Sequence, residues 1–296
     1  MESVLGNITA LGKTLAHEHL TINLSFNKSD DSNLNDDLAM LEDLKDLKAA
    51  GVDTIIDVTN IGMGRNIERM RKLSIQSGVN VIASTGYYKS PYLPSEVEQL
   101  SVEQLCSIME LEITKGIDGT EIKAALIGEI GTSDQMTDSE KKVFEAAALA
   151  HLRTGVPIYT HTTLGKLGIE QIEFLINHGV NPAKVVIGHL DLNPDMEYYK
   201  RVADYGCYMG FDTVGKISYQ PDEIRAKNIA ALVKLGFGNR ILLSLDITRK
   251  SHLKAYGGYG HVYLFEKFIP MLYEQGLTSQ DVDRLLIDNP SAWFLQ

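Results

Sequence analysis

The stretch Thr14-Leu15-Ala16-His17-Glu18-His19-Leu20 joins an apolar run to two histidines that stand two positions apart. Successive side chains of a strand point to opposite faces, so His17 and His19 share one face and Glu18 points away. Seven further apolar runs follow, nearly continuous and rich in β-branched residues, which favours a parallel sheet covered on both faces. The predicted strands are Thr14 to Leu20, Thr54 to Thr59, Asn80 to Thr85, Ala124 to Ile130, Pro157 to Thr162, Val185 to Leu190, Cys207 to Thr213 and Arg240 to Ile247.

Helical patterns separate these strands, with apolar residues recurring at intervals of three and four. Eight such alternations, with right-handed crossovers, most simply close into a (β/α)8 TIM barrel, which typically takes about 250 residues. An open doubly wound sheet is the alternative, but it calls for a glycine-rich phosphate loop where His17-Glu18-His19 stands. We therefore predict one α/β domain over residues 1–296, with an extra helix after strand eight. Predicted helices include 35–50, 95–115, 139–154, 169–178, 221–235 and, as the extra helix, about 261–275.

The net charge of the chain limits the kinds of partner that it is expected to bind. Its 28 basic and 39 acidic residues give a net charge of −11, which disfavours binding to nucleic acid or to an anionic membrane. We expect a small-molecule substrate. Residues 1–10 lack the basic and apolar stretches of a signal peptide, and no apolar run reaches 18 residues, so we expect a cytoplasmic protein. Cys106 and Cys207 lack metal or redox spacing and are expected to be free, buried thiols.

Metal-binding side chains end several of the predicted strands. Glu129 ends the fourth, His161 the fifth, His189 the sixth and Asp246 the eighth. Barrel enzymes place their chemistry at the carboxyl ends of the strands, where these residues and the histidine pair would meet. Nitrogen and oxygen ligands suit zinc, with manganese, cobalt or iron as alternatives. We expect two divalent ions, with Glu129 between them, although a carboxylate there also suits the capping of a loop or helix.

The segment Gly12-Lys13-Thr14-Leu15-Ala16-His17-Glu18-His19-Leu20 resembles the opening signature of the phosphotriesterase family within the amidohydrolase superfamily. The resemblance covers almost the whole chain and is nearest to the phosphotriesterase homology branch, which carries a glutamate at the metal bridge. It continues through Thr85-Gly86-Tyr87-Tyr88, Gly128-Glu129-Ile130-Gly131-Thr132-Ser133, His161, Gly188-His189, Phe211-Asp212 and Ser244-Leu245-Asp246.

This resemblance implies a ligand set. His17, His19 and Asp246 would bind the more buried ion, His161 and His189 the more exposed ion, and Glu129 would bridge them. Many family members use a carboxylated lysine as the bridge, so Glu129 argues against fast organophosphate hydrolysis. Lys123, at the other end of the same strand, is expected to be solvated. The resemblance also makes a homodimer the expected assembly.

The expected reaction is a hydrolysis. A hydroxide held between the two ions would be the nucleophile, because metal coordination lowers the pKa of water from about 15.7 to about 7. The more exposed ion would polarise the substrate oxygen, and Asp246 would carry the proton to the leaving group. Neither Ser244 nor Ser251 lies in a nucleophile elbow, so no protein nucleophile is expected.

Four basic residues follow Asp246, with no acidic residue before Glu266, in the region where barrels often bind phosphate. We therefore expect an anionic substrate held by Arg249, whose planar donors suit phosphate or carboxylate, with Lys250, Lys254 or Lys216 as point charges. A solvated loop or a subunit contact explains the same pattern equally well. The resemblance to lactonases places Tyr88 near the metals, where it would orient a ring oxygen or simply cover the barrel mouth.

Other polar residues receive weaker interpretations. His151 and His178 suit helix ends. His252 and His261 suit a loop or a helix start, where surface positions are expected and contact with the substrate is the alternative. Asp212 either lines the pocket or orders a loop.

The leading function is hydrolysis of a small lactone, phosphorylated sugar lactones included. The alternatives are a promiscuous phosphotriesterase or carboxylesterase, and a metal-loaded barrel that binds without turnover. A mononuclear deaminase is less favoured, because it would not need Glu129.

Overall fold

The predicted barrel strands form two parallel sheets in a computed structural model that describes residues 1–25 and 30–295. One sheet has the order β3-β4-β5 and the other the order β11-β10-β9-β8-β7-β6, while β1 and β2 form a separate antiparallel hairpin. The strands are β1 (Glu2–Ser3), β2 (Gly6–Asn7), β3 (Thr14–Glu18), β4 (Thr54–Asp57), β5 (Asn80–Ile82), β6 (Ser84–Thr85), β7 (Leu126–Thr132), β8 (Ile158–Thr162), β9 (Val185–Gly188), β10 (Tyr208–Phe211) and β11 (Ile241–Leu243).

Two seams join the sheets into a barrel. At the first, β5 and β6 are halves of one predicted strand interrupted at Ala83, whose carbonyl accepts a hydrogen bond from the Ala125 amide at 3.0 Å. At the second, the Glu18 carboxylate of β3 accepts hydrogen bonds from the amides of Leu245 and Ile247, just beyond β11, at 2.8 and 3.0 Å. The predicted (β/α)8 barrel is confirmed, with a side chain closing its last seam.

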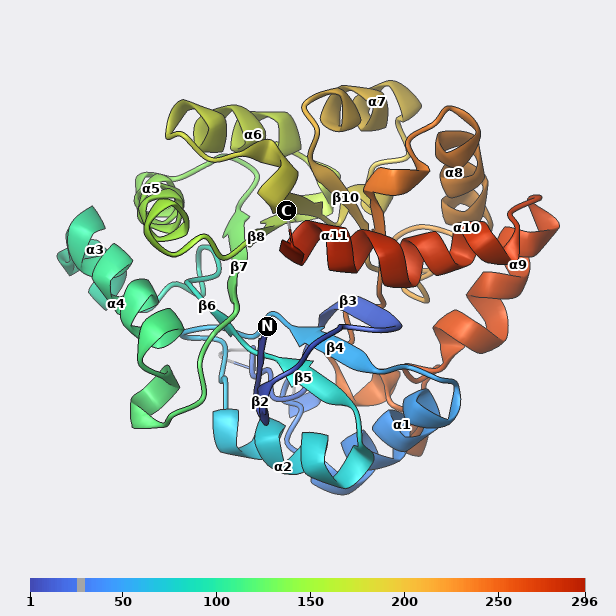
Figure 1. The fold of residues 1–296 in the computed structure, drawn as a ribbon, viewed down its shortest axis with the longest axis horizontal. Coiled ribbons are helices and arrows are strands. Elements are labelled where there is room, and N and C mark those ends of the chain that lie inside the picture. The colour runs from blue at the N-terminus through green and yellow to red at the C-terminus, as the bar shows by residue number, and fades with distance from the viewer. Residues whose placement is uncertain (26–29, 296) are drawn as a thin grey trace.

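Helices surround the barrel, as Figure 1 shows, and none in the described part of the chain is both long and apolar enough to cross a membrane. They are α1 (Asp37–Ala49), α2 (Ile67–Ser77), α3 (Glu96–Gln99), α4 (Val102–Thr114), α5 (Asp138–Thr154), α6 (Gly168–Asn177), α7 (Met196–Asp204), α8 (Asp222–Lys234), α9 (Ile269–Glu274), α10 (Ser279–Asp283) and α11 (Asn289–Leu295).

Two helix predictions need correction. The single helix predicted over residues 95–115 is divided into α3 and α4, because Ser101 forms a capping box with Gln104 and starts a new helix. The extra helix begins later than predicted, with a π-helical turn at Leu264–Phe268 that continues into α9.

His261 is fully buried rather than near the surface, because its backbone amide and its ring are both held by Asp43 of α1.

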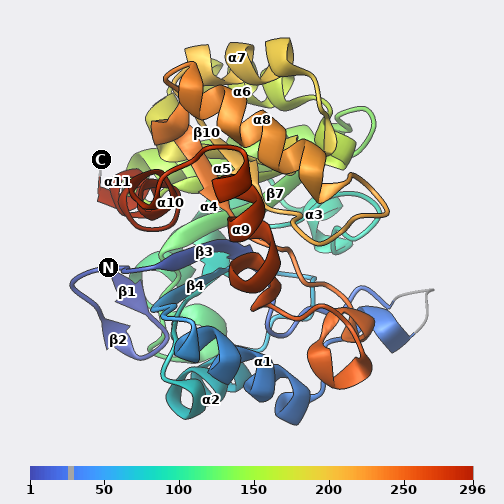
Figure 2. The same ribbon diagram turned by 90° about the vertical axis from the view of Figure 1, so that its right-hand side faces the viewer.

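The barrel interior is a separate apolar cluster to which eight strand regions contribute, including Ala16, Ile56, Tyr159 and Leu242. Trp293 of α11 closes the amino-terminal end of this cluster. Its ring lies edge-on to Tyr159 with centroids 5.7 Å apart, and its indole nitrogen donates to the carbonyl of Lys184 at 3.0 Å. Figure 2 shows α10 and α11 at the same end of the barrel as β1 and β2. The opposite end, where the strands finish, is therefore left open for a site.

Trp293→Ala is predicted to lower the free energy of unfolding by about 3 to 5 kcal/mol, because it leaves a cavity below the barrel interior and an unpaired carbonyl at Lys184. Urea unfolding at constant temperature measures the loss. Leu295→Ala, on the same helix at a side chain that is 71% exposed, is the matched control and should change stability by less than about 0.5 kcal/mol. Equal effects of the two variants would contradict the role assigned to Trp293.

Candidate metal centre

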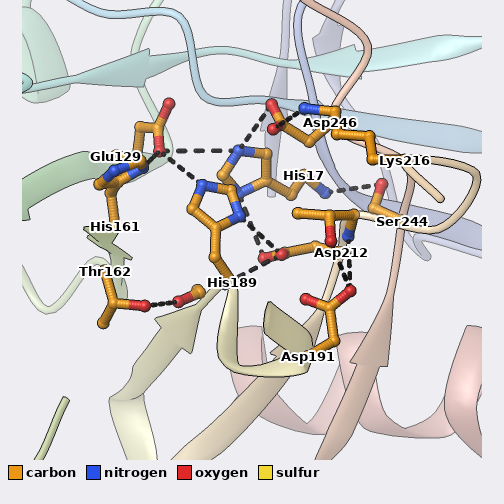
Figure 3. A network of polar contacts seen from close by, with 12 residues as sticks. His17, Glu129, His161, Thr162, His189, Asp191, Asp212, Lys216, Ser244 and Asp246 are labelled. Carbon is orange, nitrogen blue, oxygen red and sulfur yellow. Dashed lines mark hydrogen bonds and ion pairs between the residues drawn. The ribbon is translucent and has the colours of Figure 1, made fainter. Parts of the chain in front are cut away.

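Two groups of buried side chains at the carboxyl ends of the strands each have the geometry to hold one ion. His17, His19 and Asp246 form the first group, and His17, Glu129 and His189 form the second. Within each group the ligand atoms lie within 4.8 Å of one another. Figure 3 shows most of these side chains converging from different strands on one point. Because His17 belongs to both groups, the two ions would lie next to each other.

Glu129 lies among all four histidines. Its carboxylate is 3.0 Å from His161 Nδ1, and the nearest Nε2 atoms of His19, His189 and His17 are 3.3, 3.5 and 3.7 Å away. A carboxylate in this place lies within reach of both groups of candidate ligands. Glycine is required just before Glu129, because a Cβ at Gly128 would lie only 2.5 Å from the carbonyl oxygen of Tyr159 on the neighbouring strand.

His161 is placed differently from the other three histidines, since it belongs to neither group of ligands. Its Nδ1 faces Glu129, and the Tyr88 hydroxyl lies 3.2 and 3.3 Å from its two ring nitrogens. Tyr88 is itself buried, with 7% of its surface exposed. The structure therefore places Tyr88 beside the histidine predicted for the more exposed ion.

The donor set fits a pair of divalent cations. Both ring nitrogens of His17 and the Nε2 of His19 are buried and have no hydrogen-bond partner among the described residues. Leaving such an atom unpaired costs about 1 to 3 kcal/mol, and a metal ion would use its lone pair. The oxygens of Asp246 lie 3.1 Å from His19 Nε2 and 3.5 Å from His17 Nε2, so carboxylates are at hand to balance the added charge.

Charge interactions within the site favour anionic carboxylates. Burial opposes the ionisation of Glu129, but the surrounding histidines outweigh it and hold its pKa well below the usual range. Burial also opposes ionisation of Asp246, yet the charge of Lys216 and the close rings of His17 and His19 keep its pKa well below the usual range. Two negative groups in so little space form a strong site for cations.

The histidines divide into two electrostatic types. Burial, followed by repulsion from His189, lowers the pKa of His161 to about 4, so its ring is neutral, as a metal ligand must be. For His19, burial opposes protonation, but the nearby carboxylates of Asp246 and Glu129 prevail and raise its pKa to about 10. A proton on His19 and a metal ion compete for the same nitrogen.

Asp212 orients the histidines from behind. Its Oδ1 accepts hydrogen bonds from the Nδ1 and the amide of His189 at 2.8 and 2.9 Å, and its Oδ2 accepts one from the Tyr159 hydroxyl at 2.6 Å. The same carboxylate lies 3.5 Å from His17 Nδ1. Asp212 therefore fixes the orientation of the His189 and His17 rings. The sequence had suggested two other roles for it, lining the pocket or ordering a loop. The role of Tyr159 was not predicted from the sequence, because an aromatic residue in an apolar strand is typical of the hydrophobic core.

A cavity of about 250 Å³ opens beside Glu129, His161, His189 and Asp246. Two lysines line it, Lys216, whose ammonium group is hydrogen-bonded to Asp246, and Lys89. Lys89 was not singled out from the sequence, although it directly follows Tyr88. The other lining residues are Ile22, Leu24, Tyr88, Tyr92, Thr162, Thr163, Leu164, Leu192, Thr213, Tyr219 and Thr248.

The predicted anion-binding residues are distributed unevenly. Arg249, which is 48% exposed at its side chain, lines an adjoining cavity of about 370 Å³. The two cavities share Lys216, Tyr219 and Thr248 in their walls.

Lys250 and Lys254 line neither cavity. They form ion pairs with Asp30 and Asp46, which attach the loop after β11 to the region of α1.

The remaining residues that the sequence analysis discussed lie outside the candidate metal centre. His151 Nδ1 is 2.7 Å from the carbonyl oxygen of Val156, and His178 Nδ1 is 2.8 Å from that of Phe174, as expected for histidines at helix ends. Cys106 and Cys207 are free and buried, as predicted. Lys123 is partly exposed and lies 3.9 Å from Glu2.

Comparisons with known proteins agree with this geometry. A model of the phosphotriesterase family matches residues 1–294. The phosphotriesterase homology protein of Escherichia coli K12 is 47% identical over 285 residues, which cover 96% of this chain and 98% of that protein. Its crystal structure, with phosphate in the active site, covers 97% of this chain and 100% of its own, with a TM-score of 0.95.

Two further relatives act on different bonds. The N-acetyltaurine hydrolase of Danio rerio is 32% identical over 339 residues, covering 99% of this chain and 97% of that protein. A lactonase from Listeria monocytogenes, 31% identical, has a crystal structure that covers 99% of this chain and 98% of its own, with a TM-score of 0.94. The chain therefore belongs to the phosphotriesterase family and is a metal-dependent hydrolase.

Proposed function

We propose that this hydrolase opens small anionic lactones, phosphorylated sugar lactones in particular. The observation that carries the proposal is the cationic side of the cavity: Lys89 and Lys216 face the same space as the candidate metal ligands. A related lactonase and a related protein with phosphate in its active site support an ester carbonyl and an attached anion as the two recognised groups.

The proposed centre holds two divalent ions, with zinc the first candidate. His17, His19 and Asp246 would hold one, His161 and His189 the other, and Glu129 would bridge them. Such a pair of ions supplies an activated water molecule and polarises a carbonyl oxygen.

The protein residues supply proton transfer and orientation. Asp246 is ionised and hydrogen-bonded to Lys216, so it can accept a proton and deliver it to the leaving alkoxide as the ring opens. The Tyr88 hydroxyl, which lies beside His161 and lines the cavity, would donate a hydrogen bond to the ring oxygen of a lactone. No covalent intermediate on the protein is needed.

The substrate anion would lie between the two cavities. Lys216 faces both of them, and Arg249 on the far side offers paired donors for a phosphate. Lys250 and Lys254, which the sequence also suggested, are not part of this proposal, because neither lines either cavity.

One alternative acts on amides instead of esters. The related N-acetyltaurine hydrolase carries out such a reaction, and its substrate name includes a sulfonate-bearing amine. The cations beside this cavity would accept a sulfonate or carboxylate as readily as a phosphate. Phosphotriesterase, carboxylesterase and binding without turnover remain alternatives that use the same metal centre.

The first test is a substrate comparison. Protein containing close to two zinc ions per chain should hydrolyse a sugar γ-lactone, and should prefer the form with a terminal phosphate by about 10-fold or more in kcat/KM, because charged hydrogen bonds contribute about 1.5 to 3 kcal/mol. Removing the ions with a chelator should abolish turnover, and adding them back should restore it. Hydrolysis of N-acetylated amines without any lactone hydrolysis would replace the lactonase proposal.

Asp246→Asn tests catalysis against mere binding. Turnover should fall by about 100-fold or more, because the amide cannot accept the proton, while part of the metal is retained. Both kcat and metal content must be measured on the same sample. Unchanged residual activity at normal metal content would point to a contaminating enzyme or to a protein that binds without turnover.

Arg249→Ala tests the anion subsite. It should lower kcat/KM for the phosphorylated lactone by about 10- to 100-fold and leave the neutral lactone within about 2-fold, since only the former loses a charged hydrogen bond. Arg153→Ala is the control and should affect neither substrate, because Arg153 is an exposed arginine of α5 that pairs with Glu103 of α4. A similar loss on both lactones would remove Arg249 from the subsite.

A further inference from the structure

Asp246 has an unusual backbone conformation. Its φ of 53° lies in the left-handed region, which is unfavourable for most residues with a side chain. Asparagine and aspartate tolerate this region better than most residues, but something must hold the peptide there. The side chain of Asp246 depends on it to reach His19, at 3.1 Å.

Glu18 holds the peptides on both sides of Asp246. Its Oε1 accepts hydrogen bonds from the Leu245 amide at 2.8 Å and the Ser244 hydroxyl at 2.7 Å, and its Oε2 accepts one from the Ile247 amide at 3.0 Å. The Ser244 hydroxyl in turn accepts a hydrogen bond from the amide of His17 at 3.1 Å. One carboxylate thus links the strand that carries two histidine ligands to the segment that carries Asp246.

Two further buried side chains, His261 and Asp43, extend this network beyond Glu18. His261 Nε2 lies 3.6 Å from Glu18 Oε2, and His261 Nδ1 lies 3.0 Å from Asp43 Oδ2. All three side chains are fully buried. Asp43 also accepts hydrogen bonds from the amides of His261 and Lys254, at 3.1 and 3.3 Å. The network therefore reaches both ends of the loop that carries Arg249.

The charges in this network support each other. Burial opposes protonation of His261, but its hydrogen bond to Asp43 and the charge of Glu18 raise its pKa above the ordinary value. Burial likewise opposes ionisation of Asp43, yet His261 lowers its pKa. The His261 ring therefore lies between the carboxylates of Asp43 and Glu18, with its Nδ1 held by Asp43 and its Nε2 facing Glu18.

We propose that Glu18, with His261 and Asp43 behind it, is a positioning group that sets Asp246 against the histidine pair and so determines the affinity of the first ion. None of the three lines the substrate cavity. The inference rests on the proposed metal ligands of this site, and it concerns how those ligands are held rather than which substrate is hydrolysed.

Two near-isosteric variants test the proposal. Glu18→Gln keeps one acceptor oxygen but presents an NH2 group to the Ile247 amide, so one of the two peptides beside Asp246 is released. His261→Asn keeps a donor near Asp43 and removes the ring nitrogen that faces Glu18. Glu140→Gln is the matched control, because Glu140 is an equally buried carboxylate that accepts hydrogen bonds from Ser90, Ser133 and Thr137, away from Asp246.

The measurement is zinc retention by holoprotein against a graded chelator, together with kcat and KM at a temperature where circular dichroism shows each variant folded. Glu18→Gln should weaken retention of one of the two ions by about 10- to 100-fold, the usual effect of removing a partner behind a metal ligand. Its kcat should fall while KM stays within about 3-fold. His261→Asn should change the same quantities in the same direction by a smaller factor.

Glu140→Gln should lower thermal stability and keep both ions. The proposal is overturned if folded Glu18→Gln retains two ions with wild-type affinity, or if His261→Asn leaves zinc retention unchanged. Should Glu18→Gln not fold, His261→Asn decides the outcome alone. Failure of the wild type to hydrolyse any lactone would refute the proposed substrate class, while zinc retention would still report on Glu18.

Discussion

The buried carboxylate of Glu18 closes the barrel and determines what the barrel can do. The described residues show parallel pairing along each of the two barrel sheets, whereas β3 is joined to the segment after β11 through the side chains of Glu18 and Ser244. A barrel with an open seam would not keep its first and last strand ends at a fixed distance. Because His17 and His19 come from one side of that seam and Asp246 from the other, the contacts that close the barrel lie beside the candidate metal centre.

The candidate metal centre concentrates charged groups in the protein interior, which lowers stability unless the charges are paired. Glu129 and Asp246 are both buried and anionic, and burying even one charge is costly unless it is paired. Histidines, Lys216 and, in the proposed loaded state, two divalent ions offset that cost. Asp212 and Tyr159 lie one layer further in, where they fix ring orientation and exclude other arrangements of the same ligands.

The fold and the ligand types could be predicted from local sequence. Continuous β-branched runs predicted the barrel strands, and the polar residues that end those runs predicted Glu129, His161, His189 and Asp246 as neighbours. Errors arose where a tertiary contact overrode the local pattern. His261 resembled a surface residue in a glycine-rich segment, but Asp43, more than 200 positions earlier, draws it into the core. Likewise, the run of basic residues after Asp246 did not reveal that Lys250 and Lys254 pair with Asp30 and Asp46, which lie equally far away in the chain.

By itself the sequence determined the alternation of strand and helix, the placement of ligand residues at strand ends and the acidic balance that favours small-molecule chemistry. These follow from periodicity and residue type, which are local properties. Only the tertiary structure decided which cations face the cavity, that Glu129 lies among four histidines, and that Trp293 closes the other end of the barrel. Such facts depend on distances between segments far apart in the chain, and no local pattern records those distances.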